Sequence, residues 1–170
     1  SYLDDHAARA AETLGPGVQT SITVRHSGAT LRVSSSDARA GACDQVEARV
    51  EDGPCIVAMS GLEPVVVPDV TAEWRWPTWS RAVLDNGFGS SVAVPAAVDP
   101  TAAVAVNIYG EPGIRWEPDR VELAGRLAAD VAADLRARLQ QAARVATPLD
   151  DLDSEAAVVD RAVGVIMQGN

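Results

Sequence analysis

Apolar residues recur along this chain with two different spacings, and each spacing predicts one type of secondary structure. In residues 3–14 they recur every three or four residues, as on one side of a helix, and the Gly-Pro-Gly that begins at Gly15 predicts where that helix ends. In residues 21–26 and 29–36, β-branched or apolar residues alternate with polar ones on either side of Ser27-Gly28. This alternation predicts two antiparallel strands joined by a tight turn.

The middle of the chain continues as short helices and strands. Prolines and the pairs Asp-Gly and Asp-Pro separate its apolar runs, so they mark the ends of the elements. The expected elements are a helix from 37 to about 52, a helical turn at 55–60, a strand at 64–70 that Pro68 ends or places at an edge, a helix over 71–86 interrupted at a Trp-Pro pair, and strands at 87–94 and 102–110.

The longest helix is predicted over residues 117–146, with Pro118 in its first turn. Large apolar residues fall at intervals of four along it, which makes one apolar stripe. A helix of this length exceeds what a small domain needs to cover itself. We therefore expect its first half to pack on the sheet and its second half, from Leu135 to Val145, to pair with a second copy of the chain. A monomer whose core helix has a mobile end is the alternative.

These elements together indicate an α+β fold with a central, mainly antiparallel sheet and helices on both faces. The helices at 3–14 and 117–146 are expected to cover one face, and residues 37–86 the other. We predict one domain over 1–146, a linker over 147–153 and a C-terminal helical fragment over 154–170. Apolar residues recur at helical spacing in that fragment, but the sequence ends before such a helix could bury its stripe, so we expect it to open a second domain.

Composition and charge narrow the class of protein. The chain has 170 residues, of which 47% are hydrophobic and only 4% aromatic, and its net charge is -10. Such an acidic surface repels phosphate backbones, so the chain by itself is expected to be a poor nucleic-acid binder. No apolar run approaches the ~20 residues that span a bilayer. Two cysteines, Cys43 and Cys55, fit a reducing compartment, and we expect a cytoplasmic protein without membrane contact.

Three tryptophans within six residues are the sharpest candidate for a binding site. Trp74, Trp76 and Trp79 could wall a ligand pocket, or they could cover the core beneath a loop. Asn107 interrupts an apolar strand, and a buried amide needs partners, which could be backbone groups or a ligand. Cys55 could be a reactive thiol or a small buried hydrophobe. Further polar candidates for a cavity lining are Asp44, Gln45, Asp69, Ser90 and Ser91.

No catalytic or metal site is readable. His6 and His26 are the only histidines, and neither has a neighbouring residue at metal-ligand spacing. The glycines around Phe88 lack the lysine and helix of a phosphate-binding loop. We therefore predict no enzyme activity, no metal and no cofactor.

Five segments, taken in order, resemble a GAF domain of the actinobacterial type, and the match covers about residues 5–145. They are VSSSDARAGACDQVEA, EDGPC, VVVPDVTAEWRWPTWS, GFGSSVAVPAAV and AVAVNIYGEPGIRWEPD. In that family the tryptophan-rich segment lies over the ligand cavity. The tail VVDRAVGVIMQ resembles the first helix of an ANTAR domain, a module that binds RNA hairpins in transcription antitermination.

The resemblance implies a signal-sensing domain of a bacterial antitermination regulator. A small-molecule or dimer signal would be passed to an RNA-binding ANTAR output, and RNA would be bound only through the missing C-terminal part. The ligand site would involve Trp74, Trp76, Trp79, Asn107 and Cys55, and the protein would be a homodimer through the 117–146 helix. The alternative is a ligand-free GAF dimerisation module with a filled pocket.

Overall fold

Five antiparallel strands form the sheet at the centre of the domain. The computed structural model describes residues 1–145 and 163–164, without the side chains of Arg32 and Val33. The strands are β1 (Val18–His26), β2 (Ala29–Ser35), β3 (Val65–Val67), β4 (Ser90–Ala97) and β5 (Ala102–Gly110). Their order in the sheet is β2-β1-β5-β4-β3, so the hairpin predicted from the alternating residues forms one edge and the short strand ended by Pro68 forms the other.

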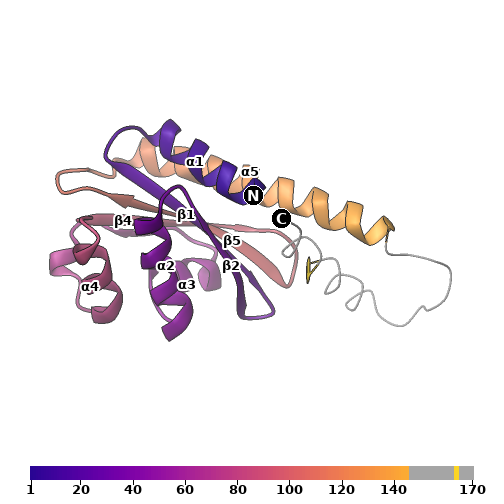
Figure 1. Ribbon diagram of the computed structural model, residues 1–170, viewed down its shortest axis with the longest axis horizontal. Coiled ribbons are helices and arrows are strands. Elements are labelled where there is room, and N and C mark those ends of the chain that lie inside the picture. The colour runs from indigo at the N-terminus through magenta and orange to yellow at the C-terminus, as the bar shows by residue number, and fades with distance from the viewer. Residues whose placement is uncertain (146–162, 165–170) are drawn as a thin grey trace.

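Helices cover both faces of this sheet (Figure 1). On one face, α1 (Tyr2–Leu14) and α5 (Pro118–Val145) lie side by side. The other face carries α2 (Ala38–Val50), α3 (Pro54–Gly61), the short 3-10 helix η1 (Val70–Ala72) and α4 (Pro77–Asp85). The predicted α+β class, with a mainly antiparallel sheet between two helical layers, is confirmed.

Local sequence explains where the helices of the second layer begin. Asp37 accepts a hydrogen bond from the Ala40 backbone nitrogen at 2.9 Å and so caps α2. Pro54 and Pro77 each occupy the first turn of their helices, where the missing N–H is not needed. The interruption expected at the Trp-Pro pair therefore separates η1 from α4.

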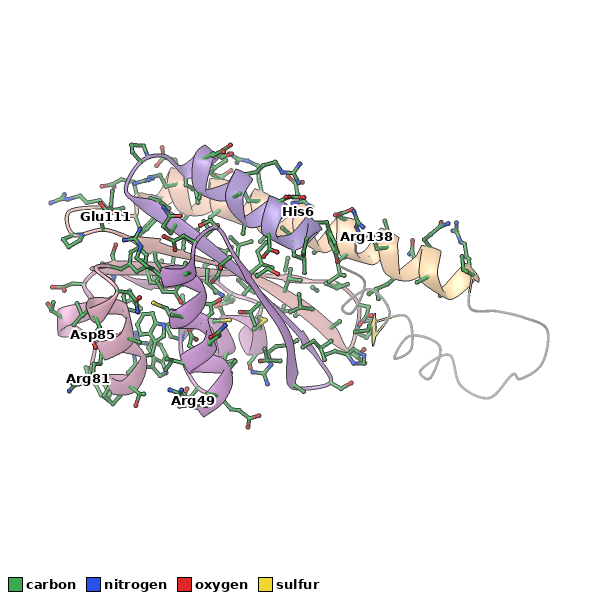
Figure 2. All side chains as sticks on the ribbon, viewed as in Figure 1. His6, Arg49, Arg81, Asp85, Glu111 and Arg138 are labelled. Carbon is green, nitrogen blue, oxygen red and sulfur yellow. The ribbon has the colours of Figure 1, made fainter. Side chains whose placement is uncertain are left out.

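The main apolar core lies between the sheet and the α1/α5 pair. Alternate residues of the central strands, such as Ile22, Val94 and Val106, point to it and are fully buried. The small residues Ala124 and Ala128 bring α5 close to the strands. Figure 2 shows His6 on α1 and Arg138 on the neighbouring part of α5.

The long helix meets α1 through polar contacts as well. The Nε2 atom of His6 lies 3.0 Å from Oδ2 of Asp134 on α5. The guanidinium of Arg138 lies 3.8 Å from the centre of the Tyr2 ring. These contacts hold α1 along the middle of α5, whose last turns extend beyond the sheet (Figure 1).

The second half of α5, from Leu135 to Val145, was expected to pair with a second copy. Part of it is buried in the core of this chain. Leu135 and Leu139 are 1% and 8% exposed and belong to the main core, whereas Val145 is 77% exposed. The predicted linker at 147–153 lies outside the described residues, as does all of the C-terminal fragment except Val163 and Gly164. Val163 is buried against the main core.

Candidate functional site

The face of the sheet under α2 and α3 is built from small and polar side chains. This contrasts with the opposite face, where valines and isoleucines meet α1 and α5. Small or polar residues on a covered sheet face leave either space or hydrogen-bonding groups in the interior. Three neighbouring rows of paired residues lie on this face: Ser21, Asn107 and Ala93; Thr23, Ala105 and Pro95; Arg25, Ala103 and Ala97. A further row holds Gln19, Tyr109 and Ser91.

The carboxylate of Asp44, from α2, lies over the first of these rows. Asp44 is 1% exposed, and it accepts hydrogen bonds from the hydroxyls of Ser21, Thr23 and Tyr109 and from the amide of Asn107. Burial raises the pKa of Asp44, and these four hydrogen bonds act in the opposite direction. Asp44 thus joins α2 to β1 and β5 through neutral donors.

A second buried carboxylate, Glu47, lies one turn further along α2. It is 2% exposed and accepts a hydrogen bond from the Cys55 backbone nitrogen at 2.8 Å. Burial and the nearby charge of Asp44 raise the pKa of Glu47 well above the usual range of a glutamate. Gly53 makes room for this side chain, because a Cβ atom there would lie 2.2 Å from Oε2 of Glu47.

Asn107 lies in the centre of the polar cluster and is 1% exposed. Its Nδ2 atom donates to Asp44 and, at 3.2 Å, to Oγ1 of Thr23. These are side-chain partners, and so this buried amide is held by the cluster rather than by the backbone. Its Oδ1 atom is buried and has no hydrogen-bond partner among the described residues.

The three tryptophans occupy different environments. Trp79 is 1% exposed and packs with Phe88 and Tyr109 in a second core cluster. Trp76 meets Trp79 edge to face, with 6.1 Å between ring centroids. Trp74 is 83% exposed and lies apart from both.

A small pocket of about 200 Å³ lies beside the two buried indoles. The polar groups of Asp52, Arg75 and Trp76 in its lining are already engaged. Nε1 of Trp76 donates to Oδ1 of Asp52 at 3.1 Å, and the Arg75 guanidinium lies 4.2 Å from the centre of the Trp76 ring. The pocket is lined by Val50, Asp52, Arg75, Trp76, Pro77, Thr78 and Trp79.

Both cysteines are buried thiols. Burial and the charges of Glu47 and Asp44 raise the pKa of Cys55 well above the ordinary range, and burial raises the pKa of Cys43 to about 12. A thiol with so high a pKa is a weak nucleophile at neutral pH. The structure brings Cys55 close to Asn107, and it acts there as a small packed side chain.

Other expected polar residues are divided between interior and surface. Asp44, Ser90 and Ser91 are buried, whereas Gln45 and Asp69 are exposed. Glu47 and Tyr109 were missed. The signal for Glu47 was present, since Glu47 falls on the same helical stripe as Ala40 and Cys43, and stripe positions are buried.

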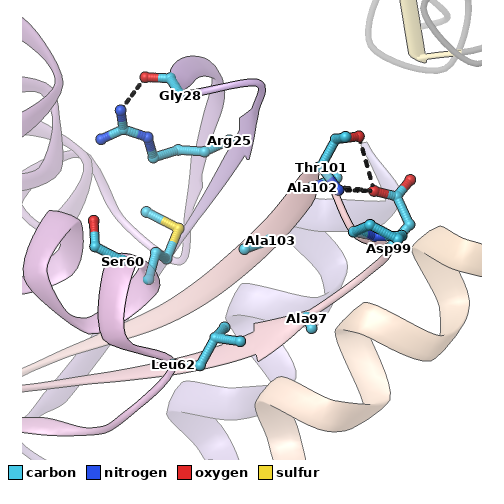
Figure 3. A pocket seen from close by; sticks show the side chains of 11 residues that line it. Arg25, Gly28, Ser60, Leu62, Ala97, Asp99, Thr101, Ala102 and Ala103 are labelled. Atoms are coloured by element: carbon cyan, nitrogen blue, oxygen red, sulfur yellow. Dashed lines mark hydrogen bonds between the residues drawn. The ribbon is translucent and has the colours of Figure 1, made fainter. Parts of the chain in front are cut away.

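A larger pocket, of about 320 Å³, opens at the C-terminal end of α3 (Figure 3). It shares no residue with the predicted tryptophan site. The β1–β2 turn, the end of α3 and the β4–β5 hairpin border this open pocket. It is lined by Arg25, Gly28, Met59, Ser60, Leu62, Ala97, Asp99, Pro100, Thr101, Ala102 and Ala103.

The part of the chain that the structure describes holds neither a cluster of metal-ligating side chains nor a membrane-spanning helix. There, no group of three or more histidine, cysteine, aspartate or glutamate side chains could hold a metal ion. No helix among these residues has the length and apolar character that crossing a membrane requires.

Comparison with known proteins identifies the fold. No protein-family model matches the sequence, and no curated protein matches it. Among solved structures, the photoproduct state of a GAF domain from Synechocystis has a TM-score of 0.63 at 12% identity, covering 86% of this chain and 98% of that one. The GAF domain region of a Geobacter sulfurreducens protein has a TM-score of 0.53 at 18% identity, covering 79% and 91%.

A red/green cyanobacteriochrome in its red-light-absorbing state is also similar, with a TM-score of 0.57 at 11% identity over 86% of this chain and 97% of that one. The three similarities extend over most of each chain, so the architecture of the domain is that of GAF domains.

Proposed function

We propose that this domain is the signal-sensing regulatory part of a cytoplasmic bacterial transcription antitermination regulator. In this proposal a signal received in the α2/α3 layer or at a dimer surface alters α5, and α5 passes the change to an RNA-binding ANTAR output. The GAF-like architecture supports the sensory role, because the similar solved structures include photoreceptor domains.

The observation that carries the proposal is the position of α5. This helix packs on the sheet through Ala124, Ala128 and Val131 and then continues past it to Val145. A rigid helix that is anchored in one domain and extends from it can transmit a small shift over its length. A change at the sheet would therefore reach whatever follows residue 145.

A homodimer through the exposed end of α5 is part of this proposal. Leu135 and Leu139 are occupied in the core of the chain, so the pairing surface would lie on the exposed positions of the last turns, including Val145. Pairing there would set the relative orientation of two output modules.

Changing the helical phase of α5 in the intact regulator tests the transmission. Two alanines inserted after Ala143 rotate the following residues by roughly 200°, whereas seven alanines nearly preserve the phase. We expect the two-residue insertion to change the affinity for RNA hairpins recovered with the intact protein by about fivefold or more. The seven-residue insertion should bind like the unaltered protein. Equal affinity of all three proteins would overturn the proposal.

A ligand-free dimerisation module with a filled pocket is the second candidate. The packing of Asp44, Glu47 and Trp79 over the polar sheet face favours it, because these side chains occupy the interior of the α2/α3 layer. Native mass spectrometry separates the two candidates. A dimer that carries a co-purified small molecule supports sensing, whereas a bare dimer whose melting temperature rises with protein concentration supports the filled module.

A further inference from the structure

We propose that the pocket at the C-terminal end of α3 binds a small organic carboxylate, with the guanidinium of Arg25 holding its carboxylate group. This proposal gives the sensory function proposed above a ligand class and a binding site. The effect of binding on α5 rests on that proposed function. The site is separate from the tryptophan pocket.

Missing side-chain volume creates the pocket. Arg25, Ala103 and Ala97 form one row across β1, β5 and β4, so two methyl groups make the floor beside the arginine. The chain turns away at Leu62, which follows α3 in a left-handed conformation with φ of 52° and leaves the floor uncovered. The resulting volume of about 320 Å³ lies at the lower end of the range for small-molecule sites.

The charge in the pocket favours an anionic group at Arg25. This is the one cationic side chain among the lining residues, and no ion pair between described residues includes it. Its Nη2 atom donates to the neutral carbonyl of Gly28 (Figure 3). The planar guanidinium fork matches the two oxygens of a carboxylate.

Asp99, the other charged residue that lines the pocket, is hydrogen-bonded within the β4–β5 turn. Oδ1 of Asp99 accepts hydrogen bonds from the backbone nitrogens of Thr101 and Ala102, each at 2.7 Å, and from the Thr101 hydroxyl at 3.0 Å. Met59 and Leu62 join the two floor alanines in an apolar wall. A short aliphatic chain suits this wall, so the ligand class is a carboxylate with a short apolar body.

The wall of the pocket is tied directly to α5. Arg136 donates from Nη2 to the carbonyl of Ala97 at 2.9 Å and from Nε to that of Val98 at 2.7 Å. Ala97 lines the pocket, so a ligand that moves this strand end also moves the acceptors that hold α5. Ligand binding would thus shift α5 through the two hydrogen bonds of Arg136.

Thermal unfolding of the chain with sodium salts of linear carboxylates, from acetate to hexanoate, tests the site at constant ionic strength. We expect a saturable rise in Tm of about 3–6 °C at ten times the Kd of the best chain length. Alcohols and amines of equal length and inorganic phosphate should give no such rise. The absence of a saturable rise with every carboxylate, or an equal rise with phosphate, would overturn the proposal.

Three variants locate the effect. Arg25→Gln should weaken binding at least tenfold, and Ala103→Leu should fill the floor and abolish the rise in a folded protein. Arg49→Gln, an exposed arginine on α2, is the matched control and should respond like the unaltered protein. A response of Arg25→Gln or Ala103→Leu equal to that of the unaltered protein would refute this location. The two proposals can fail separately. If carboxylates raise Tm but the α5 insertions leave RNA affinity unchanged, the binding site is real and the transmission through α5 is wrong.

Discussion

The carboxylate of Glu47 lies 2.8 Å from the backbone nitrogen of Cys55 and thereby caps a helix to which it does not belong. Gly53, which precedes α3, has no side chain to accept from the first turn, and so α2 supplies the acceptor. Because Glu47 is buried, this contact fixes α3 against α2 and also places an ionisable group in the interior.

The pH dependence of folding should report this group. Burial raises the pKa of Glu47 in the folded chain, so between the ordinary glutamate value and the raised value the folded state binds more protons than the unfolded state. The free energy of unfolding should therefore fall as pH rises through this window. Glu47→Gln keeps an acceptor for Cys55 and removes the titration.

Urea unfolding of both proteins from about pH 5 to about pH 8 checks this prediction. The stability of the unaltered protein relative to Glu47→Gln should decrease with pH. Asp44 titrates in both proteins, and so most of its contribution cancels in the difference. A difference that stays constant or grows with pH would contradict the prediction.

Gly53, in the α2–α3 connection, should be poorly replaceable by any residue with a side chain. Its φ of 145° disfavours other residues, and a Cβ would collide with the buried Glu47 side chain. Gly53→Ala should lower the free energy of unfolding by about 3 kcal/mol. Gly113→Ala is the matched control, since its φ is 94° but nothing lies within 4 Å of the added Cβ. Gly113→Ala should lower the free energy of unfolding by about 1 kcal/mol. Equal losses for the two variants in denaturant unfolding would show that the collision with Glu47 adds nothing to the cost of the positive φ.

The tryptophans should differ sharply in their contribution to stability. Trp79→Ala removes a fully buried indole from the second core cluster and should cost about 3–5 kcal/mol. Trp74→Ala removes a side chain that is 83% exposed and should change stability by less than about 0.5 kcal/mol. The urea midpoint of each variant measures these effects. Similar losses for the two variants would mean that Trp74 has a partner in solution.

The order of elements was predictable because local patterns set it. Alternation around Ser27-Gly28 predicted the first hairpin, and the four-residue apolar interval predicted a helix over 117–146, which the structure has as Pro118–Val145. Covering of the two faces by different helices also followed from the sequence, since each amphipathic helix needs an apolar surface.

The arrangement of the interior was harder to predict, because it depends on contacts between distant residues. Asn107 was identified as a polar residue within an apolar strand, but its partner Asp44 is 63 residues away in the sequence. The pocket next to Arg25 arises from cross-strand pairing with Ala103, and neither residue is unusual within its own segment. Register, which pattern alone does not fix across distant strands, decides both features.

Arg136 provides the last prediction, since it joins α5 to the end of β4. Its two hydrogen bonds require the fork of a guanidinium, and a lysine ammonium cannot reproduce both in the same geometry. Arg136→Lys should therefore cost about 1 kcal/mol of stability. It should also speed hydrogen exchange at the hairpin amides of Val98, which donates to the Ala102 carbonyl, and of Ala102, which donates to Asp99, because the hairpin loses its tie to α5.

Arg126→Lys is the control on the same helix. Arg126 pairs with Glu122 at 3.1 Å on an exposed helix surface, and such a pair contributes little. This variant should leave both the stability and the hairpin exchange unchanged. If Arg136→Lys also left hairpin exchange unchanged, the tie would not restrain the hairpin, and a ligand that contacts Ala97 would need another route to α5.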